Sequence, residues 1–198
     1  MTWIASFNCH SFRNNMNVVK DLLLNNDIVL LQKLMMYEYD IGLIEQLDPN
    51  FICNIVVQDK LDRGIIRGRP SRGVAILYHK KLVPFIENIK VNDRINGIIL
   101  NHDNQSTLLL NVYMPYDAQT VDSLDNYRNY LAILNNIIEE SNINNVIIAG
   151  DLNADSKKGR FWSELDYFIN MLNLFHVTAD LPKIHLHTLV LQTTLLVI

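Results

Sequence analysis

Residues 146–153, with the sequence Val146-Ile147-Ile148-Ala149-Gly150-Asp151-Leu152-Asn153, are the most informative part of the chain. Its four leading apolar residues are typical of a strand that is buried on both faces. Gly150 ends the strand. Because residues i and i+2 of an extended chain point to the same side, the side chains of Asp151 and Asn153 are expected to reach together into a cleft. Such a pair can orient a water or a metal ion and hold a phosphate oxygen. An ordinary Asp/Asn turn is the alternative.

Segments of strand and helix type alternate along the rest of the chain. Asp122 is expected to cap the longest helix, whose apolar residues recur at helical spacing. This alternation predicts a layered α/β domain. The many asparagines are interpreted as a feature of composition. Strands are predicted at 4–9, 27–31, 51–57, 73–78, 98–100, 107–113 and 146–149, and helices at 14–24, 39–47, 122–138 and 161–172.

The chain has 198 residues, 49% of them hydrophobic, which is enough for one domain with a sizeable core. Its formal net charge is −4, so the molecule as a whole is not a polycation. Basic residues nevertheless gather in the segment 60–81. Such a segment can face a phosphate backbone, and a solvated loop is the alternative. The basic residues are Lys60, Arg63, Arg67, Arg69, Arg72, Lys80 and Lys81.

The two cysteines, Cys9 and Cys53, provide neither a disulfide framework nor the spacing of a metal site. Each lies in a predicted strand, where a buried free thiol is expected. No apolar run is as long as a membrane span, and no basic region precedes a hydrophobic one at the N-terminus. We therefore expect no membrane partner and a reducing, intracellular setting in the nucleus or the cytoplasm.

Polar residues recur where the predicted strands end. Layered α/β domains carry their sites at such strand ends. One polar residue at a strand end would be uninformative, whereas four strand ends in order indicate a shared cleft. The residues are Asn8, Gln32 with Lys33, Asn111 with Tyr113, and Asp151 with Asn153.

Five short motifs in this order resemble the endonuclease/exonuclease/phosphatase superfamily. The closer likeness, over residues 3–182, is to the endonuclease domain of LINE-type non-LTR retrotransposons. The resemblance implies a four-layer α/β/β/α sandwich of the DNase I type, Mg²⁺-dependent phosphodiester hydrolysis, and DNA as the partner. It also implies a parent polyprotein, whose remainder is expected to be absent here. The motifs are Ser6-Phe7-Asn8, Leu30-Leu31-Gln32, Arg72-Gly73-Val74-Ala75-Ile76-Leu77, Asn111-Val112-Tyr113-Met114-Pro115 and Gly150-Asp151-Leu152-Asn153.

The resemblance assigns roles to four residues. Asn8 matches an asparagine that supports the metal site, and Tyr113 matches a tyrosine whose hydroxyl contacts the phosphate. Asp151 matches the aspartate that activates the attacking water beside the metal, and Asn153 matches the asparagine that binds the scissile phosphate. These roles suit a reaction that needs an oriented nucleophile and positive charge near the phosphate. From the residues alone, a polar strand cap stays open for Asn8, and a half-buried aromatic for Tyr113.

Lys33 departs from the family pattern. The family's second strand ends in Gln-Glu, and the glutamate ligates the metal, whereas here Gln32 precedes a lysine. An ammonium group has donors only and cannot coordinate Mg²⁺. At ~4 Å and an effective dielectric near 20, its repulsion of a dication is about twice the ~4 kcal/mol of a unit pair. We expect Mg²⁺ occupancy to be lost unless Lys33 swings away. A direct contact of Lys33 with a phosphate is the alternative.

The C-terminal end departs as well. The family closes with a Ser/Thr-rich strand and then a strand carrying Asp-His, but here no charged residue occurs from Ile184 onward. We expect residues 1–183 to form the domain, with its closing strands incomplete. Residues 184–198 are interpreted as an unrelated apolar tail, which a reading-frame shift would explain. The tail either covers the open sheet edge or drives aggregation.

The sequence therefore predicts a LINE-type DNA endonuclease domain that is catalytically impaired in this copy. Two alternatives stay open: a noncatalytic nucleic-acid-binding remnant, and a phosphatase of the same superfamily. With a net charge of −4, DNA binding through the backbone is expected to be weak. The residues expected to contact DNA are Arg63, Arg67, Arg69 and Arg72.

Overall fold

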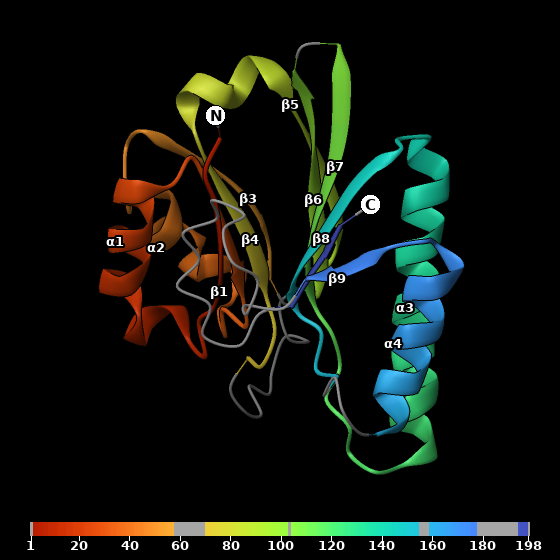
Figure 1. Ribbon diagram of the computed structural model, residues 1–198. Coiled ribbons are helices and arrows are strands. Elements are labelled where there is room, and N and C mark those ends of the chain that lie inside the picture. The colour runs from red at the N-terminus through yellow and green to blue at the C-terminus, as the bar shows by residue number, and fades with distance from the viewer. Residues whose placement is uncertain (1, 58–69, 103, 155–158, 178–193, 198) are drawn as a thin grey trace.

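The computed structural model describes residues 2–57, 70–102, 104–154, 159–177 and 194–197. Two β-sheets pack face to face, and helices cover their outer sides (Figure 1). This arrangement confirms the predicted four-layer α/β/β/α sandwich.

The first sheet has four strands in the order β1-β2-β4-β3. β1 and β2 are parallel, and the other neighbours are antiparallel. α1 and α2 lie on its outer face (Figure 1). The elements are β1 (Ile4–Asn8), α1 (Met16–Asn25), β2 (Ile28–Gln32), α2 (Ile41–Glu45), β3 (Phe51–Val56) and β4 (Val74–His79), with 3-10 turns η1 (Phe12–Asn14), η2 (Glu38–Asp40) and η3 (Lys80–Phe85).

The second sheet has six strands in the order β5-β6-β7-β8-β10-β9. β7 and β8 are parallel, because the long helix α3 connects them on the outer face. α4 packs beside α3 in the same layer (Figure 1). The elements are β5 (Ile86–Asn92), β6 (Ile95–His102), β7 (Gln105–Tyr113), α3 (Val121–Ser141), β8 (Asn145–Asp151), α4 (Arg160–Met171), β9 (Phe175–Val177) and β10 (Thr194–Val197).

Three apolar clusters hold the four layers together. One lies between the sheets and includes Leu30 and Leu109. The other two lie between each sheet and its helices, where Leu31 packs near α1 and Ile148 packs near α3. Neighbouring residues such as Leu30 and Leu31 face opposite layers, so each inner strand is apolar on both sides.

Some predicted boundaries were wrong. The cap of α3 is Thr120 rather than Asp122, because the Thr120 hydroxyl accepts from the backbone N–H of Ser123 at 3.1 Å. Asp122 instead lies in the first turn, where a negative charge suits the helix dipole. β5 and β9 were not predicted, and β6 begins at Ile95, three residues earlier than expected.

The described part of the C-terminal tail is paired within the second sheet. β10 is antiparallel to both β8 and β9, and Thr194 lies opposite Gly150. The edge of β8 that was expected to be open is therefore covered by backbone pairing. The domain boundary at residue 183 and the unrelated origin of the tail stay predictions.

Both cysteines are free, as predicted, with Cys9 buried and Cys53 half-buried. Burial raises the pKa of the Cys53 thiol to about 12 and that of Cys9 further still. Within the described ranges, we find no helix that combines the length and the apolarity required to cross a bilayer.

Candidate functional site

The ends of two parallel strand pairs bring the predicted site residues together. Asn8 lies opposite Gln32 at the end of the β1–β2 pair, and Tyr113 lies opposite Asp151 at the end of the β7–β8 pair. Across the sandwich, Asn8 Nδ2 donates to Asp151 Oδ2 at 2.5 Å. Carboxyl ends of strands from both sheets therefore meet at one place, as the sequence predicted.

Asp151 and Asn153 share a turn rather than an extended strand end. Asn153 has a φ of 48°, so the chain has left the extended conformation at this residue. The backbone N–H of Asn153 donates to Asp151 Oδ1 at 3.1 Å, and Asn153 Nδ2 donates to the Met114 carbonyl at 2.6 Å. The Asp/Asn turn is thus the means by which Asp151 is held at the site.

Burial raises the pKa of Asp151 above its ordinary value. The backbone N–H of Asn153, the charge on Lys33 and the Asn8 amide act in the opposite direction. Without these groups, the buried carboxylate would be costlier to ionise. The positive charge of Lys33 therefore favours the carboxylate form of Asp151.

Lys33 contacts His10 beside the site, and its charge reaches Asp151. Its Nζ is 3.0 Å from Nδ1 of His10, and the ammonium can only donate there. Both residues have a left-handed φ, 54° for Lys33 and 45° for His10. The backbone N–H of His10 donates to Asn8 Oδ1 at 3.2 Å, which links the two residues to Asn8.

The described residues do not fit Mg²⁺. This ion requires near-octahedral oxygen coordination. Asp151 is the carboxylate at the centre, and its two oxygens accept from Asn8 and Asn153. The Asn8 oxygen accepts from His10, and Lys33 occupies the position of the expected carboxylate ligand. Within the described ranges, no cluster of three His, Cys, Asp or Glu side chains could hold a metal ion.

Arg94 is a site residue that was not predicted from the sequence. Its guanidinium lies 4.9 Å from the centre of the Tyr113 ring, and Nη1 donates to the Tyr113 carbonyl at 2.9 Å. The Arg94 side chain is buried, so its charge acts in a medium that screens it poorly. Burial raises the pKa of the Tyr113 hydroxyl, and the Arg94 charge opposes this effect. Tyr113 therefore keeps its proton and can donate a hydrogen bond to an anion.

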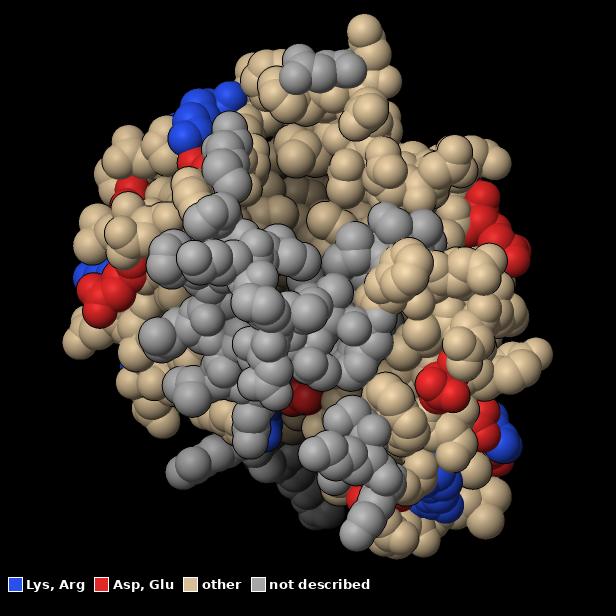
Figure 2. Space-filling model, viewed as in Figure 1, with Lys and Arg blue, Asp and Glu red and all other residues tan. Residues whose placement is uncertain are grey.

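Arg72 is the one predicted DNA-contact residue within the described residues. It pairs with Asp93, with Nη1 3.4 Å from Oδ2, and its charge reaches Arg94 and Tyr113. Arg63, Arg67 and Arg69 lie outside the described residues. On the described surface in Figure 2, charged side chains occur in small scattered groups, and several of these groups combine basic and acidic residues.

Comparison with known proteins shows the family to which the chain belongs. The chain matches the Endonuclease/Exonuclease/phosphatase family over residues 5–170. The endonuclease domain of TRAS1, a telomere-specific non-LTR retrotransposon, is similar with a TM-score of 0.64 and 12% identity, covering 99% of this chain and 84% of that chain. The 3′ phosphatase NExo from Neisseria, bound to a product DNA hairpin, has a TM-score of 0.63 and 14% identity, covering 88% and 72%.

A family protein from Leptotrichia buccalis is similar with a TM-score of 0.61 and 16% identity, covering 100% of this chain and 88% of that chain. No curated protein sequence matches. The structural likenesses establish the DNase I-like fold, and the family match extends over most of the chain. The chain therefore belongs to the endonuclease/exonuclease/phosphatase family.

Proposed function

We propose that this chain is the endonuclease domain of a LINE-type retrotransposon, impaired in hydrolysis but still able to bind the phosphates of DNA. The observation that carries the proposal is the position of Lys33, whose ammonium contacts His10 and favours the Asp151 carboxylate. Membership of the family supports a phosphodiester substrate. An intracellular setting and descent from a polyprotein belong to the same proposal.

The residues at the site favour binding of a phosphate over its cleavage. Lys33 supplies a point charge, Tyr113 a hydroxyl donor, and Arg94 a buried charge behind the Tyr113 ring. Hydrolysis would further require Asp151 to take a proton from an attacking water, while both its oxygens already accept hydrogen bonds. It would also require more positive charge against the developing pentavalent phosphate than one ammonium provides.

Nicking of supercoiled plasmid in the presence of Mg²⁺ tests the impairment. We expect the wild type and Asp151→Ala to be equally inactive. Lys33→Glu alone should stay well below full activity, because the C-terminal histidine of the family is missing. Lys20→Glu, an equal change of charge on the exposed face of α1, is the matched control. Robust nicking by the wild type that disappears in Asp151→Ala would refute the impairment.

Binding of labelled duplex DNA tests the retained function. Phosphate contacts make affinity fall steeply with salt, and binding without a metal is unaffected by EDTA. We expect Lys33→Glu to weaken this binding and Lys20→Glu to leave it unchanged. Release of inorganic phosphate from a 3′-phosphorylated strand without nicking would instead favour the phosphatase alternative.

A further inference from the structure

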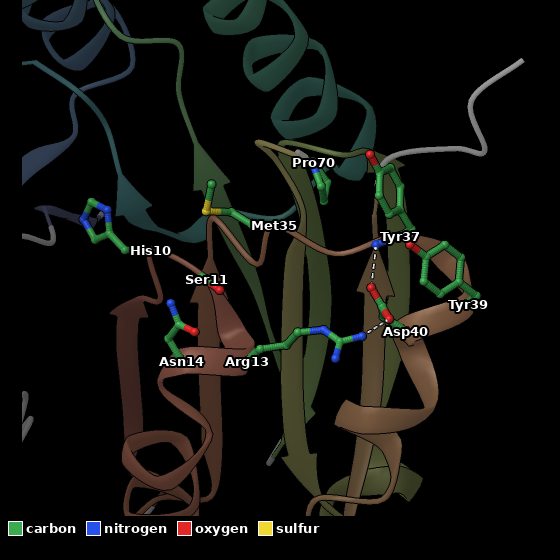
Figure 3. Close-up of a pocket in the computed structure, with 9 residues that line it drawn as sticks. All are labelled: His10, Ser11, Arg13, Asn14, Met35, Tyr37, Tyr39, Asp40 and Pro70. Atoms are coloured by element: carbon green, nitrogen blue, oxygen red, sulfur yellow. Dashed lines mark hydrogen bonds and ion pairs between the residues drawn. The ribbon is translucent and has the colours of Figure 1, made fainter. Parts of the chain in front are cut away.

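A cavity of about 500 Å³ lies beside the phosphate site, at the same end of the first sheet. Its walls come from the loop after β1 and the loop after β2, so the same two strand ends build both features (Figure 3). The volume is within the range of about 300–1,000 Å³ that is typical of small-molecule sites. The lining residues are His10, Ser11, Arg13, Asn14, Met35, Tyr37, Tyr39, Asp40 and Pro70.

One wall of this cavity is aromatic. Tyr37 and Tyr39 stand together across the cavity from His10 and Asn14 (Figure 3). Their ring centroids are 5.5 Å apart at an interplanar angle of 32°. Tyr37 is buried and fixes the wall, whereas Tyr39 is 71% exposed and presents its ring to an incoming group. A flat π-system can stack on such a ring.

Polar side chains also line the cavity, and an ion pair holds one of them in place. Arg13 forms an ion pair with the buried Asp40, and the Asp40 carboxylate also accepts from the backbone N–H of Tyr37 (Figure 3). This arrangement fixes the Arg13 guanidinium along the cavity. Asn14 and Ser11 add an amide and a hydroxyl, which can pair with both donors and acceptors on a ligand edge.

The cavity and the phosphate site share one residue, His10. This residue lines the cavity, and its Nδ1 is 3.0 Å from the Lys33 ammonium. Its backbone N–H donates to Asn8, which in turn donates to Asp151. A single strand with one phosphate at Lys33 can therefore run past His10 and place a base farther along the strand against Tyr39.

We propose that this cavity is a subsite for an unpaired nucleobase of a single-stranded nucleic acid. The inference rests on the proposed function, because another phosphate of the same strand would occupy the Lys33 site. A nucleobase combines a π-face for Tyr39 with an edge of donors and acceptors for Asn14 and Ser11. A base inside a duplex has its faces covered by its neighbours and cannot enter.

Binding of two labelled strands of equal length tests the proposal. One is oligothymidylate, and the other is a deoxyribose-phosphate strand without bases. Tyr39→Ala should weaken binding of oligothymidylate by about tenfold and leave binding of the base-free strand unchanged. Tyr39→Phe should retain wild-type affinity, because the ring carries the stacking. Tyr167→Ala is the matched control, since Tyr167 is 70% exposed and lies on α4, in the outer helix layer that covers the second sheet.

Equal circular dichroism spectra and melting temperatures of Tyr39→Ala and Tyr167→Ala establish that both variants are folded. If the wild type binds the base-free strand but Tyr39→Ala does not weaken binding of oligothymidylate, the subsite is overturned. The proposed function would still stand in that case. Equal losses on the two strands would overturn it as well. Failure of the wild type to bind either strand would overturn both proposals.

Discussion

The backbone at Gly150 has no room for a side chain, and this steric constraint sets where Asp151 leaves the sheet. Its φ is 141°, and a Cβ atom here would lie 2.0 Å from the carbonyl oxygen of Val112. No side chain fits such a contact, and the backbone conformation itself disfavours one. Glycine therefore allows β7 and β8 to approach closely where Asp151 leaves the sheet.

We expect Gly150→Ala to lower the free energy of unfolding by about 3 kcal/mol or more, because both the contact and the conformation must be relieved. Urea unfolding measures the change. Gly42→Ala in α2 is the control, since the nearest atom to its Cβ is Gln46 Nε2 at 3.8 Å. In that helix, alanine should raise stability by about 0.5–1 kcal/mol. Equal effects of the two changes would contradict the steric explanation.

Asp151 should also give stability a specific pH dependence. Burial raises its pKa above the ~3.9 of an unfolded aspartate, so the native state binds more protons between the two pKa values. Its contribution therefore favours the fold at low pH and is lost as the pH rises through the native pKa. Asp151→Asn removes this loss. The melting temperature of the variant minus that of the wild type should increase from pH ~3 to neutral. A constant difference would show that the carboxyl is not desolvated.

The residues of the site could be predicted only where the strands themselves present them. Asn8, Tyr113 and Asp151 follow apolar runs, so strand periodicity alone brings them to one end of the sandwich. Arg94 and His10 could not be predicted in this way. Arg94 reaches Tyr113 through the register of the β5–β6 hairpin, and His10 reaches Lys33 through a left-handed turn. Neither arrangement leaves a periodic signal in the sequence.

Among the elements, the apolar strands were predicted, whereas the exposed strand β5 and the C-terminal strands β9 and β10 were not. β2 and β8 are nearly continuous apolar runs, because they face packed layers on both sides. β5 is an edge strand that is exposed at most positions and is held by backbone pairing to β6. β10 joins β8 from more than forty positions away along the chain, a pairing that local patterns do not specify.

The contribution of β10 can be tested by removing one backbone donor. Leu196 lies opposite Ile148 on one side and His176 on the other. Proline cannot donate within an inner strand, so Leu196→Pro should lower the melting temperature and promote aggregation through the freed edge of β8. Val121→Pro is the control, because Val121 is the first residue of α3, where proline is tolerated. A melting temperature unchanged by Leu196→Pro would show that β10 does not stabilise the sheet.

Arg160 connects the start of α4 to the loop before α3. Its Nε donates to Asp117 Oδ2 at 3.1 Å, and Nη2 donates to Asp117 Oδ1 at 2.5 Å and to the Thr120 carbonyl at 2.6 Å. The paired guanidinium lowers the pKa of Asp117 to about 2. This pairing therefore favours the fold above the ~3.9 of an unfolded aspartate and is lost as the pH falls through about 2.

We expect Arg160→Lys to raise the pKa of Asp117 toward its ordinary value, because an ammonium cannot reproduce the bidentate fork. An NMR titration of the Asp117 carboxyl carbon measures the shift. Arg128→Lys, which changes a guanidinium paired with Glu164, should leave Asp117 unaffected. A pKa that stays near 2 in Arg160→Lys would assign the shift to the neighbouring backbone instead.

A chain of buried, hydrogen-bonded polar side chains crosses between the two sheets. Gln32 Nε2 donates to Asn111 Oδ1 at 2.7 Å, and Asn111 Nδ2 donates to Asn96 Oδ1 at 3.0 Å. Asn96 Nδ2 continues to the Asn54 carbonyl at 2.7 Å. The interpretation of the asparagines as compositional was wrong for Asn54 and Asn96, which are buried, and Asn111, expected at a shared cleft, is buried between the sheets instead. The sequence around a polar residue in an apolar strand does not show that its hydrogen-bond partner lies in the other sheet.

The polar chain should make Asn111 one of the most sensitive positions in the core. Asn111→Leu keeps the branched shape and the number of heavy atoms of the side chain but removes its hydrogen bonds. Gln32 Nε2, Asn96 Oδ1 and the carbonyls of Leu31 and Ala75 each lose their bond to Asn111. Each buried polar group that loses its partner costs about 1–3 kcal/mol, so we expect the free energy of unfolding to fall by ~3 kcal/mol or more.

The matched control is Asn145→Leu, since Asn145 is exposed at the start of β8, and its side chain donates to the Ser106 carbonyl at 3.4 Å. That change should stay within about 0.5 kcal/mol. Urea unfolding of both variants beside the wild type compares the two sites directly. A small effect of Asn111→Leu would mean that water or a shifted side chain satisfies the orphaned groups. The apolar cluster alone would then be sufficient to hold the two sheets together.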